Sequence, residues 1–317
     1  MKKKSFLDKF GGLFSSTAQL QRIVILSGVV LVLGALSFGG YYYFDRYYQP
    51  QEKIIDTAVG AAEQAVKDDP NNIDKRIVLA ENYLAVRRYD DALGIATPLI
   101  TEAPDNQRLW LVLGITNYYK GTPLEGIPFL EKFVEAYATA EMAAFNKSFM
   151  SASYYLGESY LVTDQAEMAV PVLERSYGMN GSDADTMYKL GVAYTRVQKY
   201  NEAKAILHQA TLFVPDFKEV YQQLAIVFTE TGDAALADYA NGMVAYCDKD
   251  YQTALSLLRS SEAAKSDAAP TYNGLGMVYE ALVDLPAAQD SYEKALALDP
   301  NYLSSINGLE RVKLILK

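Results

Sequence analysis

The sequence predicts an all-α fold in which helical hairpins stack into a solenoid, preceded by one apolar N-terminal helix. Two observations carry this prediction. Small and aromatic residues recur at the same places of a 34-residue frame along most of the chain, and residues 23–44 form a run of 22 residues without a charge. A period of this length is typical of repeat folds, in which each repeat buries its apolar face only by stacking on its neighbours.

The apolar run predicts a transmembrane helix over residues 23–44, so the lipid bilayer is itself an expected partner. At about 1.5 Å per residue the run is long enough to cross a bilayer core of about 30 Å. A cleaved signal peptide is the alternative, because Lys2–Lys4 would form its basic start. The run is longer than the apolar part of such peptides, however, and no A-x-A-like cleavage site follows it. We therefore expect an uncleaved anchor between an N-terminal segment, 1–22, and a linker, 45–53.

The flanking charges predict the orientation of this helix. Five cations and one anion precede it, whereas the near C-terminal side holds only Arg46 and Lys53. Because positively charged flanks stay in the cytoplasm, residues 1–22 would be cytoplasmic and the domain at residues 54–317 periplasmic or extracellular. The whole chain has a net charge of −10 and residues 1–22 carry +4, so the remainder carries −14. An acidic domain disfavours nucleic acid as a partner, since phosphates would be repelled.

The repeated places are clearest in two frames. The frames that start at Ala184 and Ala269 both have Leu-Gly at places seven and eight, tyrosine at eleven, alanine at twenty and twenty-seven, and proline at thirty-two. Further frames start at Ile73, Gln107 and Met150. Small residues at these places let two antiparallel helices approach closely, and the proline ends the second helix. This pattern resembles the tetratricopeptide repeat (TPR) family, which implies a right-handed superhelix of helix pairs with a concave face.

Three parts of the domain depart from the regular frame. Residues 54–67 fit only the second half of a repeat, and residues 302–317 have the apolar stripe of a terminal capping helix. The frame at Lys218 is recognisable in its first helix alone, and the next frame starts at Ala235, 17 residues on. We therefore expect irregular helix pairing or a change of superhelix curvature over residues 232–265.

The resemblance to the TPR family also implies a groove that binds protein. In that family, places two, five, nine and twelve of the first helices point into the concave face. The candidate groove residues at such places are Ile77, Glu81, Leu111, Ile115, Tyr118, Tyr154, Glu158, Tyr188 and Val192. One TPR subclass grips a carboxylate with lysine at place five and asparagine at place nine, and these frames have neither. A neutral or basic extended segment, or a helix with an apolar face, suits the groove better.

No catalytic constellation is recognisable. His208 is the only histidine and Cys247 the only cysteine, so a zinc cluster lacks ligands. His208 falls on the second helix of its repeat, the side that usually faces outward in the TPR family, and is expected on the surface. We expect no enzyme activity, cofactor or metal. The sequence instead predicts a membrane-anchored scaffold or adaptor that binds membrane or envelope proteins outside the cytoplasm and assembles or stabilises a complex. The alternatives are a chaperone-like holdase for newly exported proteins and, with reversed topology, a cytoplasmic adaptor.

Overall fold

The computed structural model describes residues 50–137 and 147–317, and these fall into two compact units that divide in the sequence between Val86 and Arg87. The expected cytoplasmic segment 1–22 and transmembrane helix 23–44 lie outside the described residues. Among the helices that are described, none combines the length and the apolar character that a membrane crossing requires.

The described part of the first unit is a helix pair. Helix α2 (Pro50–Asp68) packs on α3 (Ile73–Ala85), and the hydroxyl of Tyr83 donates a hydrogen bond of 2.9 Å to Glu63 Oε1 between them. Asn72 caps α3, because its side-chain oxygen accepts the backbone N–H of Lys75 at 3.1 Å. The half-repeat expected at residues 54–67 is therefore one full helix that begins four residues earlier.

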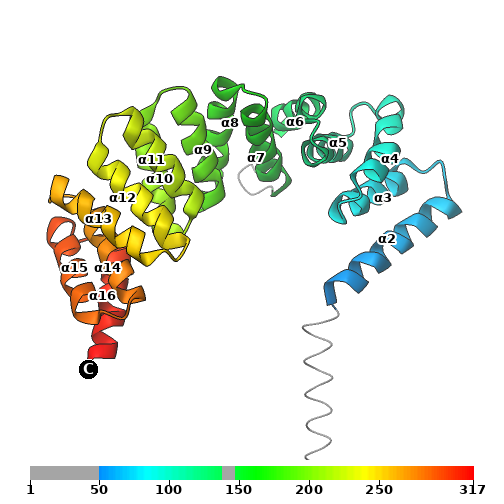
Figure 1. The fold of residues 1–317 in the computed structure, drawn as a ribbon. Coiled ribbons are helices and arrows are strands. Elements are labelled where there is room, and N and C mark those ends of the chain that lie inside the picture. The colour runs from blue at the N-terminus through cyan, green and yellow to red at the C-terminus, as the bar shows by residue number, and fades with distance from the viewer. Residues whose placement is uncertain (1–49, 138–146) are drawn as a thin grey trace, which may run out of the picture. The chain divides into compact units, whose positions relative to one another are not determined.

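The described residues of the second unit form helices and connecting turns, with no strand among them (Figure 1). The helices are α4 (Tyr89–Glu102), α5 (Gln107–Lys120), α6 (Pro123–Tyr137), α7 (Lys147–Val162), α8 (Ala166–Met179), α9 (Ala184–Arg196), α10 (Tyr200–Phe213), α11 (Lys218–Glu230), α12 (Ala234–Cys247), α13 (Tyr251–Ala264), α14 (Ala269–Ala281), α15 (Leu285–Leu298) and α16 (Leu303–Leu316). Hairpins α5–α6, α7–α8, α9–α10 and α14–α15 follow the expected frames. Each of the first helices α5, α7 and α9 also contacts the next first helix, so one face is continuous from α5 to α11.

Close approach within a hairpin depends on glycine at place eight. A Cβ added to Gly191 would lie 2.4 Å from Leu207 Cδ2, far inside van der Waals contact, and Leu207 is fully buried. The same contact recurs between Gly242 of α12 and Leu258 of α13, at 2.9 Å from Leu258 Cγ. The expectation that small residues at this place let the helices meet is confirmed, because any larger side chain would displace the opposing leucine.

Helix α12 belongs to two hairpins at once. The turns inside the four regular hairpins each hold one residue with positive φ: Gly121, Asp164, Gln198 and Val283. Turns of this kind stand on both sides of α12, with Gly232 at φ 74° and Lys249 at φ 63°. The N–H of Asp233 reaches back to the carbonyl of Phe228 at 2.9 Å, and Asp250 closes the next turn in the same way. Helix α12 is thus the second helix of one hairpin and the first of the next, which confirms the irregular pairing expected over 232–265.

The shared helix brings the C-terminal end of the chain back to earlier repeats. Tyr302, just before α16, lies with its ring centroid 5.7 Å from that of His208 on α10, and Tyr221 and Tyr239 are buried beside one another with centroids 6.2 Å apart. The expectation that His208 is a surface residue is wrong. It is half-buried, and burial lowers the pKa of its imidazole below the usual range.

Helix α16, the last described helix of the second unit, packs on α14 and α15. Its buried face is made of Ser305, Gly308 and Val312, and a Cβ on Gly308 would lie 2.4 Å from the ring of Tyr292. Arg311 donates two hydrogen bonds, of 2.9 and 3.0 Å, to the carboxylate of Glu280 on α14. This paired contact fixes the helix to the array.

Candidate functional site

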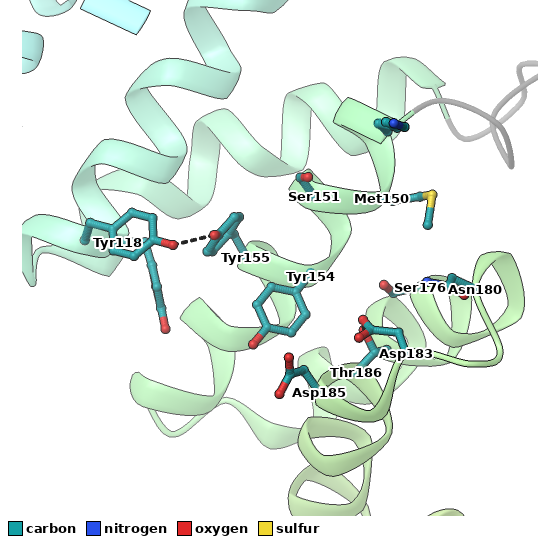
Figure 2. Close-up of a pocket in the computed structure, with 12 residues that line it drawn as sticks. Tyr118, Met150, Ser151, Tyr154, Tyr155, Ser176, Asn180, Asp183, Asp185 and Thr186 are labelled. Carbon is teal, nitrogen blue, oxygen red and sulfur yellow. Dashed lines mark hydrogen bonds between the residues drawn. The ribbon is translucent and has the colours of Figure 1, made fainter. Parts of the chain in front are cut away.

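A cleft of about 600 Å³ opens where α5, α7, α8 and α9 meet. It is lined by Tyr118, Tyr119, Lys147, Met150, Ser151, Tyr154, Tyr155, Ser176, Asn180, Asp183, Asp185 and Thr186. Figure 2 shows Tyr118, Tyr155 and Tyr154 on one side and Asp183, Asp185 and Thr186 on the other. The volume lies within the range of about 300–1,000 Å³ that ligand pockets occupy.

One side of the cleft is an aromatic surface, which we call the tyrosine wall: Tyr118 and Tyr119 of α5 and Tyr154 and Tyr155 of α7. The ring of Tyr155 lies 5.3 Å from Tyr118, 5.4 Å from Tyr119 and 5.3 Å from Tyr154, in tilted or edge-on contacts. Tyr89 of α4 stacks behind on Tyr119 at 5.7 Å, with the rings 4° from parallel. Such contacts are favourable for aromatic rings and hold the wall rigid.

A buried carboxylate, Glu158, links the tyrosine wall to a lysine of the next repeat. The side chain of Glu158, on α7, is only 4% exposed; its Oε2 accepts a hydrogen bond of 2.7 Å from the hydroxyl of Tyr118. Its Oε1 lies 2.7 Å from Lys189 Nζ of α9, an ion pair without the alignment of a hydrogen bond. The Lys189 ammonium also lies 5.2 Å from the ring centroid of Tyr188. The network therefore ties α5, α7 and α9 together.

The expectation that Glu158 faces an open groove is wrong, since the structure buries it. Place nine lies where the first helices α5, α7 and α9 meet, and the lysine of the next repeat reaches back to cover the carboxylate. A buried carboxylate requires such partners, because an unpaired charge in this position would be strongly destabilising.

The opposite side of the cleft is polar and acidic. Asp183 precedes α9 and accepts a hydrogen bond from the Thr186 hydroxyl. Asp185, in the first turn of α9, is exposed and has no hydrogen bond or ion pair with any residue that the structure describes. Figure 2 shows the hydroxyl end of Tyr154 pointing toward Asp185. The two sides of the cleft thus offer aromatic faces and an unpaired carboxylate to whatever enters.

Tyr118 and Tyr154 of the wall have pKa values raised above the usual range, so both stay protonated at physiological pH. Burial, followed by the nearby carboxylates of Glu158 and Asp185, raises the pKa of Tyr154 far above its usual value. Burial and the hydrogen bond to Glu158 raise the pKa of Tyr118 in the same direction. Burial is the larger cause of both shifts, and the nearby carboxylates add to it because they oppose a second negative charge on a phenolate.

Two of the predicted groove residues, Tyr118 and Tyr154, line the cleft directly. Their neighbours Tyr119 and Tyr155 were missed, because the family pattern assigns the groove to single places rather than to adjacent pairs. The repeated Tyr-Tyr dipeptides at 118–119 and 154–155 are the signal that could have revealed them. Side by side in α5 and α7, they form a larger aromatic surface than either predicted residue alone.

The other predicted residues do not line this cleft. Leu111, Ile115, Tyr188 and Val192 are partly buried and pack against the core, with Tyr188 also 5.5 Å from the ring of Phe217. Ile77 and Glu81 lie in the first unit. Ile77 is fully buried, so the prediction that it faces a groove is wrong; an isoleucine at this place is more stable in the interior than in water. Glu81 is partly exposed.

Two observations bear on metal binding and on thiol chemistry in the described residues. No group of three or more His, Cys, Asp or Glu side chains in residues 50–137 and 147–317 is placed to hold a metal ion. The Cys247 thiol donates a hydrogen bond of 3.4 Å to the carbonyl of Asp216, and burial raises its pKa to about 11. A thiol with such a pKa is a weak nucleophile near neutral pH.

Comparisons with known proteins agree with this architecture. Two family models, both described as tetratricopeptide repeat, match residues 77–141 and 269–302. A search of curated proteins finds no match. Among solved structures, YrrB, described as a TPR protein with an unusual peptide-binding site, is 17% identical with a TM-score of 0.53 over 63% of this chain and 98% of its own.

Two further solved structures are similar at lower scores. MamA is 24% identical with a TM-score of 0.45, over 59% of this chain and 98% of its own. The C-terminal part of a TPR repeat-containing protein from Cytophaga hutchinsonii is 16% identical with a TM-score of 0.48, over 84% of this chain and 97% of its own. The two matched segments are therefore tetratricopeptide repeats, and the described helical hairpins have the fold that such repeats build.

Proposed function

We propose that this protein is a scaffold that holds another protein in the cleft between α5, α7, α8 and α9. TPR repeats are protein-interaction modules, and the single observation that carries the assignment to this place is the tyrosine wall. Four tyrosines from two successive repeats stand at one open cleft of about 600 Å³. Tyrosine is enriched at the energetic centres of protein interfaces, because it offers a large rigid apolar surface together with a hydroxyl.

An extended segment fits this cleft better than a globular surface does. The cleft is concave and is bounded by helices of two repeats, so a narrow chain can enter between its walls. YrrB shares the helical-hairpin fold and is described as having a peptide-binding site, which supports the proposal that a TPR array of this kind takes peptide segments.

The second part of the proposal concerns the membrane. Residues 23–44 would anchor the scaffold in the bilayer, with residues 1–22 in the cytoplasm and the repeats periplasmic or extracellular, where they would assemble or stabilise a membrane or envelope complex. The uncharged run of 22 residues and the excess of cations before it support this placement. Confinement to the membrane raises the effective concentration of the scaffold near partners in the same bilayer.

Copurification tests the binding role. The full-length chain would be extracted from native membranes in mild detergent, either unchanged or with Tyr154→Leu and Tyr155→Leu together. The unchanged chain should retain a stoichiometric protein partner that the double variant loses. Equal recovery with both chains would contradict the assignment to the cleft, and a broad mixture of exported proteins would favour the holdase.

Protease accessibility tests the membrane placement. With intact cells or spheroplasts, protease added outside should digest the repeats, while a tag placed before residue 23 stays protected. Digestion of the repeats only after membrane lysis would contradict the external placement and would leave the cytoplasmic adaptor as the alternative.

A further inference from the structure

The two sides of the cleft differ in a way that selects the charge of the segment it binds. The tyrosine wall presents ring faces and edges, and a ring face carries the negative end of the aromatic quadrupole. The other side presents Asp183 and Asp185, of which Asp185 is exposed and has no ion pair or hydrogen bond among the described residues. Both features attract a cation and repel an anion.

The negative potential in the cleft is concentrated around Tyr154. Tyr154 interacts electrostatically with Asp185, toward which its hydroxyl points, and with the buried Glu158. The one cation in the lining, Lys147, is the first residue of α7. Lys147 lies seven positions before Tyr154, which corresponds to about 10 Å along the helix at 1.5 Å per residue. Lys147 makes no ion pair with Asp185, and Lys189 is already paired with Glu158.

We propose that the cleft recognises a lysine or arginine side chain of an extended partner segment, held between the ring of Tyr154 and the carboxylate of Asp185. This inference rests on the proposed scaffold function and gives its partner a stated chemistry. A neutral apolar side chain would use the rings but would desolvate Asp185 without a partner, and an acidic side chain would meet two carboxylates. The net charge of −10 on the chain favours encounter with a basic segment at longer range.

Selection from a peptide library tests the inference. The probe is a displayed library of random 12-residue peptides, each of which spans about 40 Å when fully extended. The bait is the detergent-solubilised full-length chain. Peptides enriched by the unchanged protein should carry lysine or arginine well above the frequency in the library. A synthetic peptide from this set should bind Asp185→Asn about tenfold more weakly, the effect expected for one charge-assisted contact.

Two further variants separate the causes. Tyr154→Leu keeps apolar volume but removes the ring, and it should also weaken binding of the basic peptide. Glu219→Gln is the matched control, because Glu219 is exposed, occupies place two of α11 as Asp185 does of α9, and lies outside the cleft. The affinity of the Glu219→Gln variant for the peptide should stay within about twofold of the affinity of the unchanged protein.

The outcomes distinguish this inference from the proposed function. Enrichment of peptides without basic residues, or equal affinity in Asp185→Asn, would overturn the cation inference, while a loss in Tyr154→Leu would leave the cleft as the binding site. An absence of any enriched peptide, together with full partner recovery by the Tyr154→Leu, Tyr155→Leu variant, would overturn both.

Discussion

The charge pair of Glu158 and Lys189 leads to an asymmetric prediction about stability. The Glu158 side chain is 4% exposed and that of Lys189 is 27% exposed. A substitution of Lys189 therefore leaves an unpaired charge that is buried, whereas a substitution of Glu158 leaves one that contacts water. Lys189→Met leaves a buried carboxylate with only the Tyr118 hydroxyl as a partner, and removing one member of a buried pair costs about 3–5 kcal/mol. Glu158→Gln leaves the Lys189 ammonium, which reaches water. We therefore expect this variant to lower the free energy of unfolding by about 1.5 kcal/mol, the value of one hydrogen bond to a charged group.

The assay is urea unfolding of the full-length chain and its variants in one detergent, followed by far-ultraviolet circular dichroism. Lys189→Met should shift the midpoint to clearly lower urea than Glu158→Gln does. The double variant, Glu158→Gln with Lys189→Met, should recover part of the loss because it no longer buries an unpaired charge. The reasoning is refuted if Lys189→Met is no more destabilising than Glu158→Gln, or if the two effects simply add.

Three further predictions concern single residues. Gly191→Ala should destabilise the fold by about 1–3 kcal/mol, because its Cβ would lie 2.4 Å from Leu207, whereas Gly178→Ala, with open space around it, should be neutral or slightly stabilising in the same denaturation assay. The neutral form of His208 is favoured by folding, so its contribution to stability is present above about pH 6.5 and is lost as pH falls toward the lowered pKa; His208→Gln should remove that part of the stability-versus-pH profile. Cys247, with a pKa of about 11, should react with iodoacetamide at pH 8 about tenfold or more slowly than in urea-unfolded chain, and an equal rate would contradict its burial.

The periodic part of the structure was predictable from the sequence. A glycine facing a leucine across a hairpin, as Gly191 faces Leu207, follows from places that recur in the frames at Gln107, Met150 and Ala184, because the same backbone geometry is built again each time. The same regularity placed Tyr118 and Tyr154 on the face where the cleft opens. Even the half-repeat offset that makes α12 a shared helix was visible as a frame that restarts 17 residues early.

Contacts that occur once in the array were not predictable in this way. The place-nine carboxylate of Glu158 is buried because Lys189 of the next repeat reaches it, and no rule of the frame sets that pair. His208 is half-buried because Tyr302 returns to it from far along the chain, and that return depends on the stacking angles of the helices between them. Local periodicity determines hairpins, whereas such contacts depend on how the hairpins are rotated against one another.

The most direct test of the central claim is site-specific photocrosslinking in native membranes, with a benzoylphenylalanine probe in place of Tyr154. The matched control carries the probe in place of Met168, which is 50% exposed on the second helix of the same repeat. The proposed scaffold predicts one dominant crosslinked protein from position 154 and none from position 168. No product from position 154, or the same products from both positions, would contradict binding in the cleft.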